Sequence, residues 1–395
     1  SSVLAESYVF AKSEYKVSIT VAAEAKADSD KKVKGSLIGE ISGAAGKLIP
    51  ELSYSSGTAV EIARTGSNET ANAGLVCNTL GAGTIDASSV SFPTSYNIST
   101  ENCSAGGVVG EIQTGTSLVL KNPMIGATVT GTTAAGGIAG SSSGAGITVK
   151  DSSTVGNSEN PVTIKAAENA GGLIGKAENT SVTVAAGKNI TISTESVTAT
   201  GENGNAGGLF GYFSCQDVFS FNQIKLGGTS TVKGNTAGGL VGVLVNDSDN
   251  KKIFVGNTGT DTSDTYSVTS SLEGQNLGGL IGQYSQTNAA AALEISKVDA
   301  TSSITAKEKA TYGGLIGLVQ NQERASFYGY VKAEDTTSSV TVTENAGNVT
   351  NFGGLIGAAG ADGYFLDFGN VTVTADKDGM DAENCGGLVG NLESG

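Results

Sequence analysis

The chain of 395 residues is acidic and rich in glycine, with a formal net charge of −15, 58 glycines, no histidine and no tryptophan. An acidic surface argues against binding to nucleic acid or to anionic membranes, because both need patches of Lys and Arg. The absence of histidine excludes a Ser/His/Asp or Cys/His catalytic arrangement and a His-based zinc site. No apolar run is long enough to span a bilayer as a helix.

The chain begins with two strand-like stretches, residues 8–10 and 15–21. We expect residues 1–30 to form the first coil or an N-terminal cap. After them a short pattern recurs, Gly-Gly-apolar-apolar-Gly. Four identical GGLIG copies begin at Gly171, Gly278, Gly313 and Gly353, and related copies begin at Gly106, Gly136, Gly207, Gly238 and Gly386, with degenerate ones around Leu37 and Leu75.

The third residue of each copy marks a repeat that fills the chain. The markers are Leu37, Leu75, Val108, Ile138, Leu173, Leu209, Leu240, Leu280, Leu315, Leu355 and Leu388. Their mean spacing is about 35 residues, in the range of solenoid repeats. The variable spacing indicates that insertions are tolerated between constant cores, as in stacked repeats.

Between the markers, apolar and hydroxyl residues alternate, for example in residues 162–164, 182–184, 190–192, 340–342 and 371–374. Period-two alternation with β-branched residues indicates strands, and the Asn, Gly, Asp and Ser clusters between them indicate turns. A propeller of eleven blades would exceed the usual range, and a leucine-rich repeat has a shorter period. We therefore predict an all-β fold, a parallel β-solenoid (β-helix) of about eleven coils of roughly 35 residues each, forming a single domain over residues 1–395.

Two units carry insertions, at residues 246–264 and 320–335. The second gathers an arginine and three aromatic residues, which we interpret as a packed insertion rather than a sugar subsite. These residues are Arg324, Phe327, Tyr328 and Tyr330. The chain stops just after a full-strength motif copy, so we expect an uncapped solenoid end, belonging to a fragment of a longer protein or continued by a neighbour.

The recurring Gly-Gly-Leu-Ile/Val-Gly in a β-rich unit of this length resembles the GLUG-type repeat of bacterial surface and secreted proteins. That group includes adhesin-like proteins and repeat regions beside IgA-peptidase modules. The resemblance is strongest from Gly106 to Gly390. It implies an extracellular repeat region, on a bacterial cell surface or secreted, and it carries over no catalytic residue. The zinc motif of such peptidases requires His, so that activity would lie elsewhere in a parent protein.

The fourth residue of the motif is a candidate for contact with a partner. If Gly171–Gly175 is one strand, Leu173 faces the core and Ile174 faces the other side. This ladder could be covered by a second layer, could result from a corner in the motif, or could form an exposed docking stripe. The interface candidates are Ile174, Phe210, Val241, Ile281, Ile316 and Ile356. Exposure near zero at Ile281 and Ile316 would remove the docking stripe.

The four cysteines offer one candidate disulfide. Cys215 and Cys385 lie five units apart along the stack, too far for a bond. Cys77 and Cys103 lie on neighbouring units and could bridge; the alternative is two buried free thiols.

Calcium is the one metal that the sequence brings into consideration. Asp376, Asp378 and Asp381 alternate around a glycine like the start of an EF-hand loop, but the final ligand position is Gly387 instead of Glu. A second acidic cluster contains Asp247, Asp249, Asp261 and Asp264. A solvated turn is the simpler interpretation of both clusters, and no other cofactor is expected.

These observations favour a non-enzymatic extracellular structural or adhesive protein, that is, a rigid stalk, adhesin or filament module. Its partners would be a protein or glycan on another surface, or copies of itself. A carbohydrate-binding or carbohydrate-cleaving β-helix module and a self-assembling fibre subunit remain as alternatives. An ice- or crystal-binding face would need threonines in register on a flat wall, which the variable unit lengths disfavour.

Overall fold

The computed structural model describes residues 7–8, 14–21, 36–42, 46–54, 60–64, 71–93, 96–121, 126–247, 251–257, 265–287, 291–320, 329–342, 349–360, 364–376 and 382–392. These residues form β-strands and connecting turns, with one short 3-10 helix, η1 (Ala87–Ser89). By contacts the chain divides into two compact units, Ser1–Glu195 (unit 1) and Ser196–Gly395 (unit 2). We describe each unit by itself.

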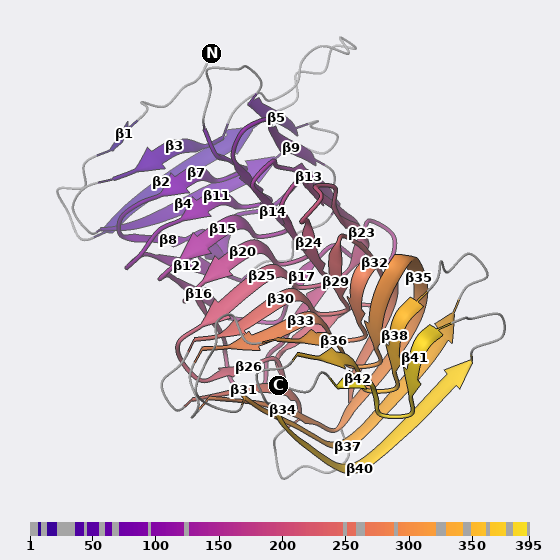
Figure 1. The fold of residues 1–395 in the computed structure, drawn as a ribbon. Helices are drawn as coiled ribbons and strands as arrows, with labels where there is room; N and C mark the ends of the chain where they lie inside the picture. The colour runs from indigo at the N-terminus through magenta and orange to yellow at the C-terminus, as the bar shows by residue number, and fades with distance from the viewer. Residues whose placement is uncertain are drawn as a thin grey trace. The chain divides into compact units, whose positions relative to one another are not determined.

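Unit 1 consists of short strands stacked in columns, each strand parallel to the equivalent strand of the next coil (Figure 1). The column after the motif contains β1 (Ser7–Tyr8), β3 (Ile38–Ile41), β7 (Cys77–Leu80), β11 (Val109–Ile112), β15 (Ala139–Ser143) and β20 (Ile174–Glu178). The next contains β2 (Glu14–Val21), β4 (Lys47–Tyr54), β8 (Thr84–Asp86), β12 (Ser117–Leu120), β16 (Gly146–Val149) and β21 (Ser181–Val184).

The coils of unit 1 return to the motif through two further sets of strands. One set contains β5 (Val60–Arg64), β9 (Tyr96–Thr100), β13 (Ala127–Thr130) and β18 (Val162–Ala166). The other, directly before the motif, contains β6 (Ala73–Gly74), β10 (Ser104–Gly106), β14 (Ala134–Gly136) and β19 (Asn169–Gly171). A further pair, β17 (Ser153–Val155) and β22 (Ile190–Ile192), is also parallel.

Unit 2 repeats this plan, and several of its strands are longer than those of unit 1 (Figure 1). Its motif column contains β25 (Phe210–Cys215), β30 (Val241–Asn246), β33 (Ile281–Gln286), β36 (Ile316–Val319), β39 (Ile356–Ala359) and β42 (Val389–Leu392). The remaining strands are β23 (Thr194–Ala199), β24 (Asn205–Gly207), β26 (Phe219–Ser220), β27 (Ile224–Leu226), β28 (Ser230–Lys233), β29 (Thr236–Gly238), β31 (Lys252–Gly256), β32 (Tyr266–Gly278), β34 (Ala292–Ser296), β35 (Val298–Gly313), β37 (Gly329–Val342), β38 (Val349–Gly353), β40 (Tyr364–Asp376) and β41 (Ala382–Gly386).

Register explains why the sequence forms these columns. Equivalent residues of successive repeats pair directly, so each coil places an apolar side chain above the one before it. Val129 pairs with Ile164, and Ile147 pairs with Val182. The first three of these residues are buried, and Val182 is half-buried. Alternating Val-Thr-Val stretches therefore turn their valine and isoleucine side chains inward and their threonine hydroxyls outward.

The prediction of an all-β parallel solenoid is confirmed. The alternating stretches named above all fall in strands, namely β18, β21, β22, β37 and β40. The number of complete turns is about eight, slightly fewer than the eleven coils predicted from the markers. Some repeats near the ends supply only part of a coil within the described residues.

Candidate functional site

The motif forms a corner, not a straight strand. In the copy that starts at Gly353, β38 ends at that glycine, Gly354 and Leu355 form a bend, and β39 begins at Ile356. The bend turns both Leu355 and Ile356 into the interior, where they are 0% and 1% exposed. The third and fourth residues of the motif are therefore both core residues.

This geometry overturns the docking-stripe interpretation of the fourth residue. All six interface candidates are at most 1% exposed in the isolated chain, so they cannot contact a partner from the core. The corner was one of the three explanations left open by the sequence, and it accounts for the second apolar position. These six residues are Ile174, Phe210, Val241, Ile281, Ile316 and Ile356.

Each glycine of the corner is required by a different close approach of backbone. A Cβ on Gly353 would overlap the carbonyl oxygen of Ile356 in the same corner. A Cβ on Gly354 would overlap the carbonyl oxygen of Gly387 in the next coil. A Cβ on Gly357 would lie 2.5 Å from the carbonyl oxygen of Gly317 in the preceding coil. The three glycines of the motif therefore allow each corner to pack against the coil before it and the coil after it.

In the corners that start at Gly313 and Gly353, the N–H groups of the bend and of the residue after it donate to the following coil. The N–H groups of Gly354, Leu355 and Ile356 donate to carbonyls of the following coil at 3.2, 2.9 and 2.9 Å. The acceptors are the carbonyl oxygen of Gly386 for the first and that of Leu388 for the other two. The corner that starts at Gly313 repeats this pattern at 3.1, 2.8 and 3.0 Å. The bend of the corner at Gly353 therefore donates to its successor, and the carbonyl oxygens of Gly353 and Leu355 accept from its predecessor.

The last corner, Gly386–Gly390, presents this donor side without cover among the described residues. Leu388 is 44% exposed and Leu392 is 65% exposed, whereas Leu355, the equivalent of Leu388 one coil earlier, is fully buried. Nothing lies within 4 Å of a Cβ built on Gly387. We call the corner Gly386–Gly390 together with β40, β41 and β42 the open edge.

A buried carboxylate in unit 1 is a second notable site. Asp86, at the end of β8, is 4% exposed and lies between two ammonium groups: its Oδ2 is 3.1 Å from Lys47 Nζ and 2.8 Å from Lys150 Nζ. Its Oδ1 accepts hydrogen bonds from the backbone N–H (3.2 Å) and the hydroxyl of Ser88. Burial alone would raise the pKa of Asp86, but the hydrogen bonds from Lys150, Ser88 and Lys47 outweigh it and hold the pKa well below its usual range.

A buried amide network occupies the end of the motif column in unit 2. Asn246 and Gln286 pair in register, and both are at most 1% exposed. Asn246 Nδ2 donates to the carbonyl of Ala292 at 3.1 Å. Gln286 Oε1 accepts from Tyr284 Oη at 3.0 Å and from the backbone N–H of Tyr330 at 3.1 Å. These hydrogen bonds connect the motif column to β34 and β37, a structural role that the sequence spacing did not predict.

The cysteines are free thiols. Cys77 is buried at the start of β7, whereas Cys103 is half-buried next to β10, in a different sheet, and the two are not joined. Burial raises the pKa of the Cys77 thiol to about 12. Cys215 is buried and Cys385 is exposed on β41. The candidate disulfide is therefore absent, and the alternative of free thiols fits, although Cys103 is less buried than expected.

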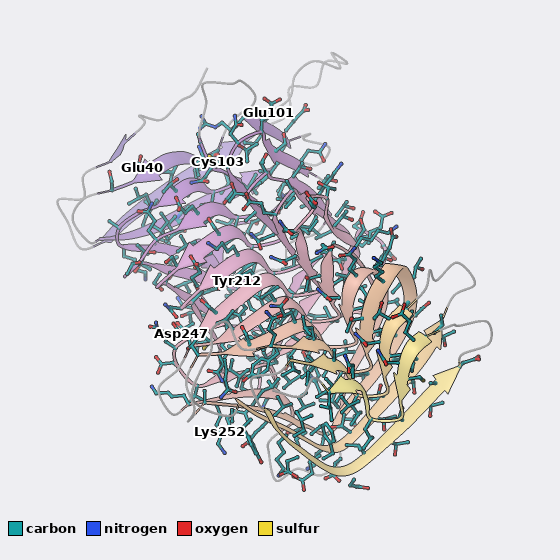
Figure 2. All side chains as sticks on the ribbon, in the orientation of Figure 1. Glu40, Glu101, Cys103, Tyr212, Asp247 and Lys252 are labelled. Atoms are coloured by element: carbon teal, nitrogen blue, oxygen red, sulfur yellow. The ribbon has the colours of Figure 1, made fainter. Side chains whose placement is uncertain are left out.

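The acidic candidates for calcium are only partly described. Asp376 is exposed at the end of β40, and Asp378 and Asp381 lie outside the described residues. In the other cluster Asp247 is exposed (Figure 2) and accepts from Thr287 Oγ1 at 2.5 Å; Asp249, Asp261 and Asp264 lie outside the described residues. The described residues contain no group of three or more side chains placed to hold a metal ion.

The aromatic insertion is also described only in part, because Arg324, Phe327 and Tyr328 lie outside the described residues. Tyr330, on β37, is half-buried and donates its hydroxyl to Asp367 Oδ2 at 3.0 Å. Within the described part, this tyrosine is held by a neighbouring strand.

Outward hydroxyl side chains in unit 2 stand in register although the unit lengths vary. Thr269, Thr301, Ser339 and Thr374 follow one another across β32, β35, β37 and β40. The row beside them contains Asp299, so a carboxylate interrupts the hydroxyl face. This register is kept although β35 carries extra residues between Ala306 and Thr311, where its pairing with β32 shifts.

Part of the chain is similar to a known protein. No family model and no solved structure matches the chain. The chain is 30% identical over 171 residues to Halomucin of Haloquadratum walsbyi, a match that covers 43% of this chain and 2% of that protein. Among the described residues, no helix is long and apolar enough to cross a membrane. The chain spans a very small part of its curated relative, so the solenoid architecture, rather than a named family, is what defines this protein.

Proposed function

We propose that the protein is a non-enzymatic structural repeat protein that works outside the cell, as a stiff spacer or adhesive module on a surface. The observation that carries this proposal is the glycine corner. The same backbone interface recurs from coil to coil, with three hydrogen bonds of similar length at each of the corners starting at Gly313 and Gly353. An interface repeated without change resists bending equally along a stack, which is what a spacer needs.

Two further observations support the proposal. The described strands use their inward side chains for packing and their outward side chains for solvated hydroxyl and charged rows, as around β32 and β35. The similarity to a protein named Halomucin is in keeping with a hydroxyl-rich stalk, the type of segment to which the word mucin refers. The partner that such a module would display or contact is a protein or a glycan.

Removal of whole coils tests the structural role. Residues 241–355 begin at the fourth residue of one motif and end at the third residue of a later one, so their deletion joins two equivalent half-corners. We expect the shortened chain to fold, and labels placed on either side of the deletion to approach by about 4.8 Å per removed coil, the distance between paired strands. Spin-label distance measurements on both chains provide the readout.

The spacer role would be refuted if the chain no longer folded after the deletion of whole coils, or if the distance between the two labels did not change. Location is tested separately, by labelling intact cells with an antibody against the protein. Labelling only after the cells are opened would refute the extracellular part and leave the spacer role standing. Release of reducing ends from a panel of surface polysaccharides would refute the non-enzymatic part.

A further inference from the structure

A polar residue stands two positions before the first glycine of every motif copy in unit 2. These residues pair with one another in register from coil to coil, on the strands that lead into the corner. We call them the polar ladder: Asn205, Thr236, Asn276, Thr311, Asn351 and Asn384. The glycine corner alone does not account for asparagine or threonine at this position, because both have side chains that need hydrogen-bond partners when they are buried.

Side-chain hydrogen bonds run along the polar ladder. Thr311 and Asn351 are 9% and 8% exposed. The amide nitrogen Nδ2 of Asn351 donates to Oγ1 of Thr311 in the preceding coil at 3.1 Å. The oxygen Oδ1 of Asn351 accepts from Nδ2 of Asn384 in the following coil at 2.9 Å. One side chain therefore connects three coils, and it does so only when the three ladder residues lie side by side.

The polar ladder lies where coils of unequal length come back into register. The pairing of β32 with β35 is interrupted, and it resumes with Asn276 opposite Thr311. The pairing of β35 with β38 shifts directly after Ala310, and the next pair is Thr311 with Asn351. In both cases the first pair back in register is a pair of ladder residues.

A third pair of coils shows the same behaviour. Thr198 of β23 pairs with Lys233 of β28, and pairing resumes with Asn205 opposite Thr236 in the polar ladder. The first coil has more residues between these two positions than the second, and the surplus includes a turn at residues 201–203. These coils therefore differ in length before the polar ladder and agree in register at it.

We propose that the polar ladder restores the register between coils of unequal length. The alternation of inward apolar and outward hydroxyl residues does not define the register by itself, because a slip of two residues keeps every side chain on its own face. Such a slip would move Asn351 away from Thr311 and leave a buried amide without its partner, which is unfavourable. A wrong register is therefore penalised at the position that leads into the corner. The inference goes beyond the proposed function and does not depend on it.

The test combines an insertion with a change of the polar ladder. One serine is inserted after Lys307, ahead of the ladder residue of β35, in the wild-type chain and in a chain with the apolar pair Thr311→Val and Asn351→Leu. Register is measured by the disulfide that forms after the paired substitutions Leu318→Cys and Ala358→Cys, two positions that pair in register beyond the corner. The spacing of paired strands allows such a bond, and peptide mapping by mass spectrometry gives its yield.

We expect the insertion to change the crosslink yield by less than about twofold when the ladder is wild type. With the apolar pair the same insertion should lower the yield about tenfold, because a slipped register no longer leaves a buried hydrogen-bonding group without a partner. Without the insertion the apolar pair should crosslink like the wild type, since apolar groups of similar shape replace both partners. Equal yields with the insertion in both ladders would overturn the proposal and would mean that the glycine corner restores the register alone.

A second pair of substitutions separates polarity from a disturbance of packing. Thr311→Asn with Asn351→Thr exchanges the two ladder residues and keeps hydrogen-bonding groups opposite each other, so this chain should tolerate the insertion as the wild type does. A loss of crosslinking as large as that of the apolar pair would overturn the proposal. If the apolar pair does not fold, as judged by circular dichroism, the single variant Thr311→Val takes its place. Its yield must then be lower with the insertion than without it, and equal yields would overturn the proposal. The spacer role is tested separately by the deletion of whole coils.

Discussion

Substitution of Gly279 by alanine tests whether the glycine corner holds the coils together. Gly279 is the second glycine of an internal corner, and a Cβ there would overlap the carbonyl oxygen of Gly314 in the next coil. The two coils must then separate at the point where the N–H groups of Gly279, Leu280 and Ile281 donate across the interface at 3.2, 2.9 and 2.9 Å.

The expected loss can be worked from these contacts. Forcing an extra methyl group into a packed interior costs about 1–3 kcal/mol. Each backbone hydrogen bond contributes about 1 kcal/mol net, so straining three of them without breaking them all costs about 2 kcal/mol. We expect Gly279→Ala to lower the free energy of unfolding by about 3–5 kcal/mol, toward the upper end of single substitutions.

The assay is urea unfolding followed by far-ultraviolet circular dichroism, with Gly387→Ala as the matched control. Gly387 occupies the same motif position, but nothing surrounds its Cβ. The difference between the two variants therefore excludes the effect that replacing glycine by alanine has on the conformational entropy of the unfolded chain. If the urea midpoint of Gly279→Ala lies no lower than that of Gly387→Ala, the steric explanation of the second glycine is wrong.

Two more predictions concern charged and thiol groups in unit 1 and on the open edge. Asp86→Asn should cost about 2 kcal/mol at pH 7, since hydrogen bonds to a buried charged group are lost and Lys47 and Lys150 lose their shared partner. Because the pKa of Asp86 is lowered in the folded state, its contribution is present above the unfolded pKa of about 3.9 and is lost as the pH falls below it. Urea titrations should therefore show a difference between the two proteins that is constant from pH 7 to about pH 4 and begins to narrow as the pH falls further toward the lowered pKa of the folded state. A difference that narrows already between pH 7 and pH 5 would contradict this. In the native protein a maleimide should modify Cys385 first and Cys77 only on unfolding, because Cys77 is buried and its burial raises the pKa of its thiol to about 12. Peptide mapping by mass spectrometry measures the two rates. Equal rates for Cys77 and Cys385 would refute the prediction.

The solenoid architecture could be predicted from the sequence because the Gly-Gly-apolar-apolar-Gly motif is short and recurs along the chain. Leu173 and its equivalents are each followed by alternating stretches that become strands, and register brings identical positions together. The variable spacing did not disturb this, because the pairing resumes in register after the extra residues, as it does in β35 at Thr311.

The burial of both apolar residues of the corner could not be predicted from the sequence pattern alone. Treating Gly171–Gly175 as one strand put Leu173 and Ile174 on opposite faces, whereas the bend buries both. A glycine pair permits a bend without requiring it. The bend is required by carbonyl groups of the neighbouring coils, which are far away in the sequence and have no signature in it. The partners of Asp86 were missed for the same reason, since Lys47 and Lys150 belong to other coils.

The one-directional bonding of the corners also bears on how such a chain changes length during evolution. The glycines of a corner meet chiefly the backbone of the two neighbouring coils, through carbonyl and amide groups that the copies supply alike. Recombination that gains or loses a whole repeat therefore rejoins surfaces that already match. A single residue gained inside Gly-Gly-apolar-apolar-Gly would instead misplace all three glycines at once. Length in this protein is free to vary in steps of one coil, while the five-residue corner admits almost no drift.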